Sequence, residues 1–68
     1  MVSVKAKGLS IGERELRLNG NKVKDLLTKL NLTDDAVIIV NKEGEILTSD
    51  RNLKEGEELT VIEVFSGG

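Results

Sequence analysis

The amino-acid sequence predicts an α+β fold, a mixed sheet of four to five strands with one helix packed on one face. Three observations lead to this prediction. Apolar and polar residues alternate near the N-terminus, one stretch in the first half has the helical period, and the second half contains β-branched apolar runs bounded by turn residues. The chain has 68 residues, enough for one small core. We expect residues 1–65 to form one domain and residues 66–68 to form a flexible C-terminal tail.

The first two predicted strands form a hairpin. Residues 2–7 alternate between apolar and polar side chains, so one face of the first strand is expected to be buried. Leu16 and Leu18 alternate with charged residues in the same way. Gly8 and Gly12 bracket the segment between the strands, which predicts a loose, glycine-bounded loop that closes the hairpin.

The helix is predicted from four apolar residues at positions i, i+3, i+4 and i+7, which form one stripe: Val23, Leu26, Leu27 and Leu30. We expect this stripe to lie in the core. Asn21 is the expected N-cap, because its side-chain carbonyl can accept an N–H of the first turn. Asn31 is expected to take the left-handed conformation that ends the helix. The helix is then about nine residues long.

The second half of the chain predicts three further strands. Residues 36–40 form a continuous, β-branched apolar run, which is too short for an independent helix and is expected to be a central strand. A turn at Gly44 leads to a brief strand at residues 45–47, and residues 48–54 are expected to form a surface connection. The last strand is expected at residues 59–65 and runs directly into the tail.

The composition excludes several classes of function. The chain has no cysteine and no histidine, so it lacks thiolate ligands and the most common general base, and a metal site would rest on carboxylates alone. We therefore expect no metal site and no enzyme activity. The net charge is −2 and Phe65 is the only aromatic residue, so nucleic acid is not an expected partner. No apolar stretch approaches the roughly 20 residues that cross a bilayer, and we expect a cytoplasmic protein without a membrane partner.

The most informative functional feature is the C-terminal sequence Gly67-Gly68. Glycine has no Cβ, so such a tail can pass through a narrow channel and present its terminal carboxylate without hindrance. One interpretation is a carboxylate that another protein activates with ATP and then passes to a nucleophile. The alternative is a frayed end without a function, since a terminus that nothing holds tends to fray.

The order of the predicted elements, the size of the chain and the terminal Gly-Gly resemble the ubiquitin-like β-grasp family. The resemblance is closest to the prokaryotic sulfur carriers of the ThiS/MoaD type and to the small archaeal modifiers. The matching segments follow one another along essentially the whole chain: residues 23–27, residues 37–41 with Gly44, residues 54–59, and Gly67-Gly68. The resemblance implies a β-grasp fold and a carrier function.

The resemblance also assigns the chemistry to a partner. In this family an E1-like enzyme adenylates the terminal carboxylate with ATP and Mg²⁺, so the resemblance implies that this chain binds no cofactor of its own. Gly68 would bear the reacting carbon, and Gly67 would leave the approach to that carbon open.

Three functions remain open at this point. As a sulfur carrier, the chain would hold a thiocarboxylate on Gly68 for thiamine, molybdopterin or transfer-RNA thiolation. As a protein modifier, it would be joined through Gly68 to lysines of target proteins. As a non-catalytic β-grasp binding module, it would leave the tail unused. The first two functions imply an E1-like enzyme and a sulfur donor or lysine acceptor as partners, and we expect a monomer when the protein is free.

Alternation in the last strand predicts a docking patch for the activating enzyme. If Leu59 and Val61 face the helix, the residues between and after them lie on the opposite face, which is open to solvent when one helix covers the sheet. The expected patch consists of four residues next to the glycines: Ile62, Val64, Phe65 and Ser66. The adjacent apolar pair Val61-Ile62 leaves the register open, and singly exposed apolar residues are ordinary on protein surfaces.

Overall fold

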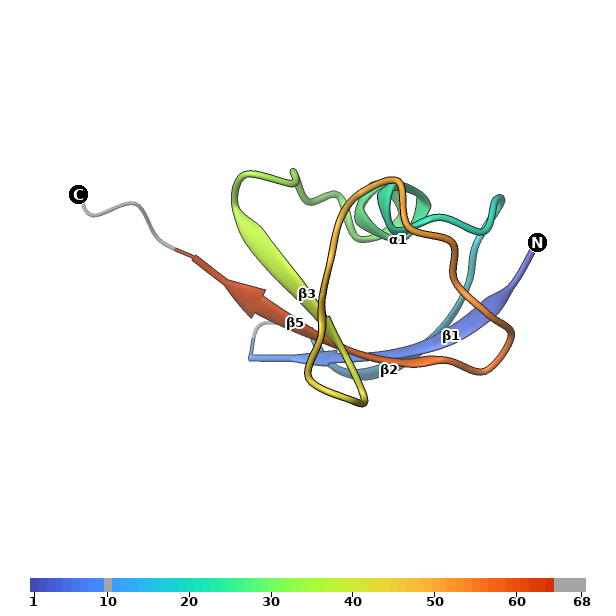
Figure 1. The fold of residues 1–68 in the computed structure, drawn as a ribbon, viewed down its shortest axis with the longest axis horizontal. Coiled ribbons are helices and arrows are strands. Elements are labelled where there is room, and N and C mark those ends of the chain that lie inside the picture. The colour runs from blue at the N-terminus through green and yellow to red at the C-terminus, as the bar shows by residue number, and fades with distance from the viewer. Residues whose placement is uncertain (10, 65–68) are drawn as a thin grey trace.

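The computed structural model describes residues 1–9 and 11–64, and within these ranges the chain forms one helix and five strands. Their order along the chain is β1 (Ser3–Gly8), β2 (Gly12–Arg17), α1 (Val23–Leu30), β3 (Val37–Asn41), β4 (Ile46–Leu47) and β5 (Glu58–Glu63). Figure 1 shows two layers, with α1 lying over one face of the sheet. The predicted α+β architecture, a β-grasp fold, is confirmed.

The sheet has the strand order β2-β1-β5-β3-β4. β1 and β5 pair in parallel, whereas the pairs β1–β2, β3–β5 and β3–β4 are antiparallel. The sheet is therefore mixed, as predicted, and the last strand lies at its centre between the first and third strands. Within the described ranges, no helix has the length and apolar character needed to span a membrane.

The start of α1 differs from the prediction. Asn21 is not the N-cap: Lys22 takes this position with an extended backbone. Its own N–H donates a hydrogen bond of 3.0 Å to Oδ2 of Asp25 in the first helical turn. A carboxylate in the first turn also suits the positive end of the helix dipole. Lys22 has no side-chain acceptor, so the first-turn N–H groups need other partners.

Those partners come from the long connection between β4 and β5. The N–H of Val23 donates to the Arg51 carbonyl (3.0 Å), and the N–H of Lys24 donates to the Ser49 carbonyl (2.9 Å). The backbone of the connection thus replaces the side-chain cap that Asn21 was expected to supply. At the other end the prediction is confirmed, since Asn31 has a positive φ of 60° and ends the helix.

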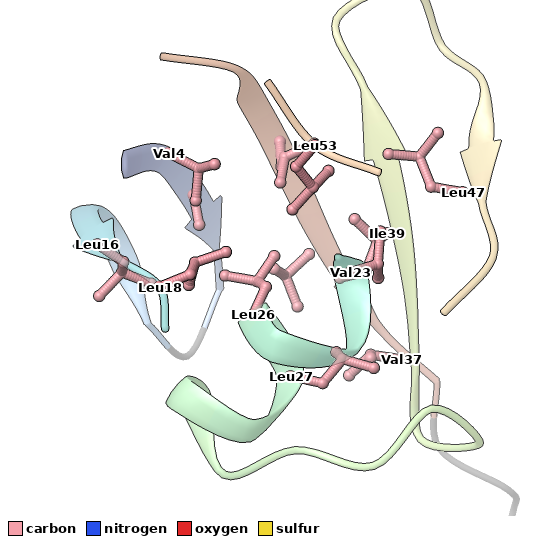
Figure 2. Packing of buried hydrophobic residues seen from close by; sticks show 13 residues of the cluster. Val4, Leu16, Leu18, Val23, Leu26, Leu27, Val37, Ile39, Leu47 and Leu53 are labelled. Carbon is pink, nitrogen blue, oxygen red and sulfur yellow. The ribbon is translucent and has the colours of Figure 1, made fainter. Parts of the chain in front are cut away.

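The core lies between α1 and the sheet (Figure 2). Three members of the predicted stripe are buried, namely Val23, Leu26 and Leu27, and Leu30 packs partly buried against them. The sheet contributes the inward residues of every strand: Val4, Ala6, Leu16, Val37, Ile39, Leu47, Leu59 and Val61. Leu18 and Leu53 complete the buried cluster from outside the strands. The face of the sheet toward α1 therefore forms one side of the hydrophobic core.

Candidate docking surface

The face of the sheet away from α1, called the open face below, carries alternate residues of the same strands. In β5, Leu59 and Val61 are 2% and 3% exposed, whereas Ile62 is 46% exposed. The sequence left the register of the adjacent pair Val61-Ile62 open, and the structure places Val61 in the core and Ile62 on the open face. Val64 is 45% exposed, and its N–H donates to the Ala36 carbonyl (2.8 Å), which continues the pairing of β5 with β3 beyond Glu63.

Apolar residues of β3 and β4 extend this surface sideways. Ile62 lies opposite Ile38, and Val40 lies opposite Thr60 on one side and Ile46 on the other. Residues opposite one another in a ladder point to the same face. The result is one largely apolar strip across the open face, called the apolar strip below and made of Val64, Ile62, Ile38, Val40 and Ile46 together with the half-buried Thr60. Ile46 is 69% exposed at the far end of this apolar strip.

The other half of the open face is charged. Register places Lys5 of β1 between Glu15 of β2 and Glu58 of β5, and it places Lys7 opposite Glu13. Nζ of Lys42 lies 3.6 Å from Oε2 of Glu58. Charges of opposite sign thus alternate across the strands and offset one another. This charged half borders the apolar strip as a polar rim, the arrangement typical of a protein interface.

A shallow hollow lies where the turn after β1 meets the end of β5. Its lining includes Leu9, Thr60 and Ile62, and the Leu9 side chain is fully exposed. A Cβ on Gly8 would lie only 2.8 Å from the Val61 carbonyl oxygen, so the strands approach too closely there for a side chain. The glycine therefore brings the exposed Leu9 next to the apolar strip.

The model of the ThiS family matches residues 5–68. The chain belongs to the ThiS family. Members of this family are ubiquitin-like sulfur carriers, small carrier proteins rather than catalysts, which work with E1-like enzymes and sulfur-transfer partners. The match includes both halves of the open face and extends through Gly68.

For this member of the ThiS family, the predicted docking patch is located in part. The structure places Ile62 and Val64 together on the open face. Phe65 and Ser66, like Gly67 and Gly68, lie outside the described residues. The proposed roles of these four residues, and the docking role of Ile62 and Val64, stay predictions.

Sequence reasoning missed Ile38, Val40 and Ile46 as members of the exposed surface. A continuous apolar run such as residues 36–40 does not reveal which of its members face solvent. The signal that could have found them is the single predicted helix, since one helix covers one face and leaves every second residue of a paired strand outside. Leu9 was missed because a lone leucine in a loop has no periodic context.

Two observations concern the ionisable side chains in the described part of this ThiS-family chain. This part contains no group of three or more His, Cys, Asp or Glu residues arranged to hold a metal ion. The Thr48 hydroxyl donates a hydrogen bond of 2.7 Å to Oδ1 of Asp50 and lowers the pKa of that carboxyl group. Asp50 is exposed and lies in the connection after β4, between the two residues whose carbonyls accept hydrogen bonds from the start of α1. The most prominent feature of the described surface is therefore the apolar strip on the open face.

Proposed function

We propose that this protein carries sulfur as a thiocarboxylate on Gly68. The observation that supports this function is the family match, which continues through Gly68. An E1-like enzyme adenylates the Gly68 carboxylate, and ATP and Mg²⁺ are bound by that enzyme. A sulfur donor then converts the adenylate to the thiocarboxylate, which serves thiamine, molybdopterin or transfer-RNA thiolation.

The chemistry explains why the carrier needs no catalytic side chain. A carboxylate is a poor acceptor, because neither of its oxygens is a good leaving group. Attack of the Gly68 carboxylate on the α-phosphate of ATP forms a mixed anhydride and releases pyrophosphate. A sulfur nucleophile then adds to the carbonyl carbon, and AMP departs. The groups that stabilise both steps belong to the activating enzyme, which suits a chain without cysteine or histidine.

The apolar strip is the proposed surface on which the activating enzyme docks. Its residues are contiguous across β5, β3 and β4, and the charged half of the open face borders them. Four residues follow Val64 in the sequence, and four residues span at most about 14 Å when fully extended. An enzyme bound to the apolar strip must therefore place its adenylation pocket within that distance of Val64.

The first test is the intact mass of the protein purified from its own host. Exchange of one terminal oxygen for sulfur is expected for a sulfur carrier. Gly-Gly remnants on lysines of other proteins, with no sulfur on the free chain, would instead identify a protein modifier. A chain that shows neither change under conditions of active sulfur transfer would leave the binding module as the better account.

The second test is ATP–pyrophosphate exchange with the E1-like enzyme of the same host. Deletion of Gly68, or replacement of Gly67 by Val, should abolish exchange while the melting temperature stays that of the unmodified protein. The matched control is Lys29→Ala, an exposed position on α1 that leaves both glycines and the predicted docking patch in place, and it should support normal exchange. Normal exchange by the chain without Gly68 would refute the proposed role of the terminal carboxylate.

A further inference from the structure

The connection between β2 and α1 contains an asparagine that is followed directly by a glycine, Asn19-Gly20. The Asn19 side chain is exposed, and residues 19–21 belong to no strand or helix. The N–H of Gly20 makes no hydrogen bond to any residue in the described ranges. The exposed amide side chain of Asn19 is thus followed by a backbone N–H that makes no such hydrogen bond. Gly20 also has no side chain that would hinder a reaction at its nitrogen.

The other four asparagines of the chain lack this combination. In three cases the N–H that follows the asparagine is held: Lys22 N–H donates to Asp25 (3.0 Å), Leu32 N–H to the Leu27 carbonyl (2.8 Å), and Leu53 N–H to the Asn21 carbonyl (2.6 Å). Each of these following residues also carries a side chain that hinders approach to its nitrogen.

In the fourth case, Asn41, the side-chain amide itself is held. Its Oδ1 accepts hydrogen bonds from the N–H groups of Glu43 (3.0 Å) and Glu45 (2.9 Å), and its Nδ2 donates to Oε1 of Glu45 (2.9 Å). Asn41 is also buried. Its amide carbon therefore cannot turn toward the backbone nitrogen of Lys42 without breaking this network.

We propose that Asn19 is a site of self-modification, at which the folded protein converts asparagine to an isoaspartyl residue. The backbone nitrogen of Gly20 attacks Cγ of Asn19 and forms a succinimide ring. The bond between Cγ and Nδ2 breaks, and ammonia leaves with the proton that Gly20 gives up. Water then opens the ring at either carbonyl. One product is aspartate, and the other is isoaspartate, in which the chain continues through the side-chain carbon.

The position of Gly20 gives this reaction a structural consequence. A Cβ on Gly20 would overlap the Asp25 carboxylate, so the glycine lies directly against that group. Asp25 in turn accepts the hydrogen bond from Lys22 at the start of α1. An isoaspartyl linkage adds one main-chain carbon before Gly20 and displaces it from Asp25. The modification should therefore loosen the start of the helix that covers the core.

The modification site lies apart from the proposed docking surface. Figure 1 places the connection between β2 and α1 at the end of the molecule where the N-terminus lies, opposite the end at which β5 finishes. The proposal at Asn19 does not rest on the proposed sulfur-carrier function. An isoaspartyl residue there would lower the stability of the fold without altering any residue of the apolar strip.

The test is a time course on the intact folded chain in warm, mildly alkaline buffer, followed by peptide mapping with mass spectrometry. The mass gain of an amide-to-carboxyl exchange should build up at Asn19 ahead of every other asparagine. Methyl transfer from S-adenosylmethionine by a protein isoaspartyl methyltransferase should detect the isoaspartyl product. Asn19→Gln should abolish this signal, because the longer side chain cyclises far more slowly, whereas the matched variant Asn52→Gln should keep it.

Two further measurements complete the design. The reaction at Asn19 should run in the folded chain at a rate close to that of the urea-unfolded chain. The separated isoaspartyl form should melt below the unmodified protein, whereas Asn19→Asp, which adds the charge without the extra main-chain carbon, should melt as before. Strong protection of Asn19 by folding, or faster conversion of another asparagine, would overturn the site. Equal melting of the isoaspartyl form would overturn its effect on α1.

Discussion

The two faces of the sheet are built from the same strands but have different tasks. In β3, Ile38 and Ile39 are neighbours in sequence with the same side chain, yet Ile39 is buried against α1 and Ile38 lies on the open face. The same division separates Val61 from Ile62 in β5. Side-chain chemistry therefore does not decide which apolar residues hold the fold together. Strand register decides it, and the apolar residues on the open face remain available to a partner.

The strongest way to break this comparison is to place the same charge on each face of β5. Val61→Glu would bury a carboxylate without a partner among apolar side chains. This costs on the order of several kcal/mol, which is comparable with the whole free energy of unfolding of a small domain. Ile62→Glu should change the free energy of unfolding by no more than about 0.5 kcal/mol, as surface substitutions usually do. Chemical denaturation of both variants measures the difference. Should Ile62→Glu unfold the protein while Val61→Glu leaves it stable, the assignment of the two faces is reversed.

The helix side of the comparison predicts a smaller but still large effect. Leu27 is buried in the stripe that faces the sheet, and Leu27→Ala should cost about 2–5 kcal/mol of unfolding free energy through lost burial and a cavity. The matched control is Lys24→Ala, an exposed position on the same helix. A shift in the unfolding midpoint no larger than that of the control would show that α1 does not contribute this face to the core.

The sequence allowed the covered face to be predicted more completely than the open face. The stripe beginning at Val23 and the alternation around Leu59 are local patterns, and local periodicity is enough to orient a helix or strand that packs on one core. The N-cap was predicted wrongly, because the first-turn N–H groups bond to the carbonyls of Ser49 and Arg51, which lie far away in the sequence. No local pattern around Asn21 contains that information.

The open face was predicted only where alternation was visible. Ile62 and Val64 were placed on it by counting every second residue along the last strand, on the condition that Leu59 and Val61 face the helix. Ile38 and Val40 sit in an uninterrupted apolar run, and Ile46 belongs to a strand of two residues, so neither segment has a period to read. Pairing with β5 assigns the face of Ile38 and Val40, and pairing of β4 with β3 then assigns that of Ile46.

The next effect concerns binding and tests how far the apolar strip extends. Ile46→Glu alters the β4 side of the apolar strip and Ile62→Glu alters its β5 side. Each should weaken binding of the activating enzyme if its position is buried in the complex, because loss of a buried apolar anchor commonly costs more than about 1 kcal/mol. Titration calorimetry with the E1-like enzyme measures both variants, and melting curves verify that each remains folded. Normal binding by Ile46→Glu together with weakened binding by Ile62→Glu would exclude β4 from the interface.

The smallest effect is expected in the charged half of the open face. Lys42 and Glu58 are both well exposed, and their charged atoms lie 3.6 Å apart, so the pair is screened by water and contributes about 0–1 kcal/mol. Lys42→Ala should therefore leave the melting temperature almost unchanged. If the charged half borders the docked enzyme, the substitution should instead alter the association rate and its dependence on salt, because rim charges steer encounter more than they hold the complex. Stopped-flow association at low and high salt measures this effect, with Lys29→Ala on the helix as the matched control. Equal salt dependence for both variants would limit the docking surface to the apolar strip.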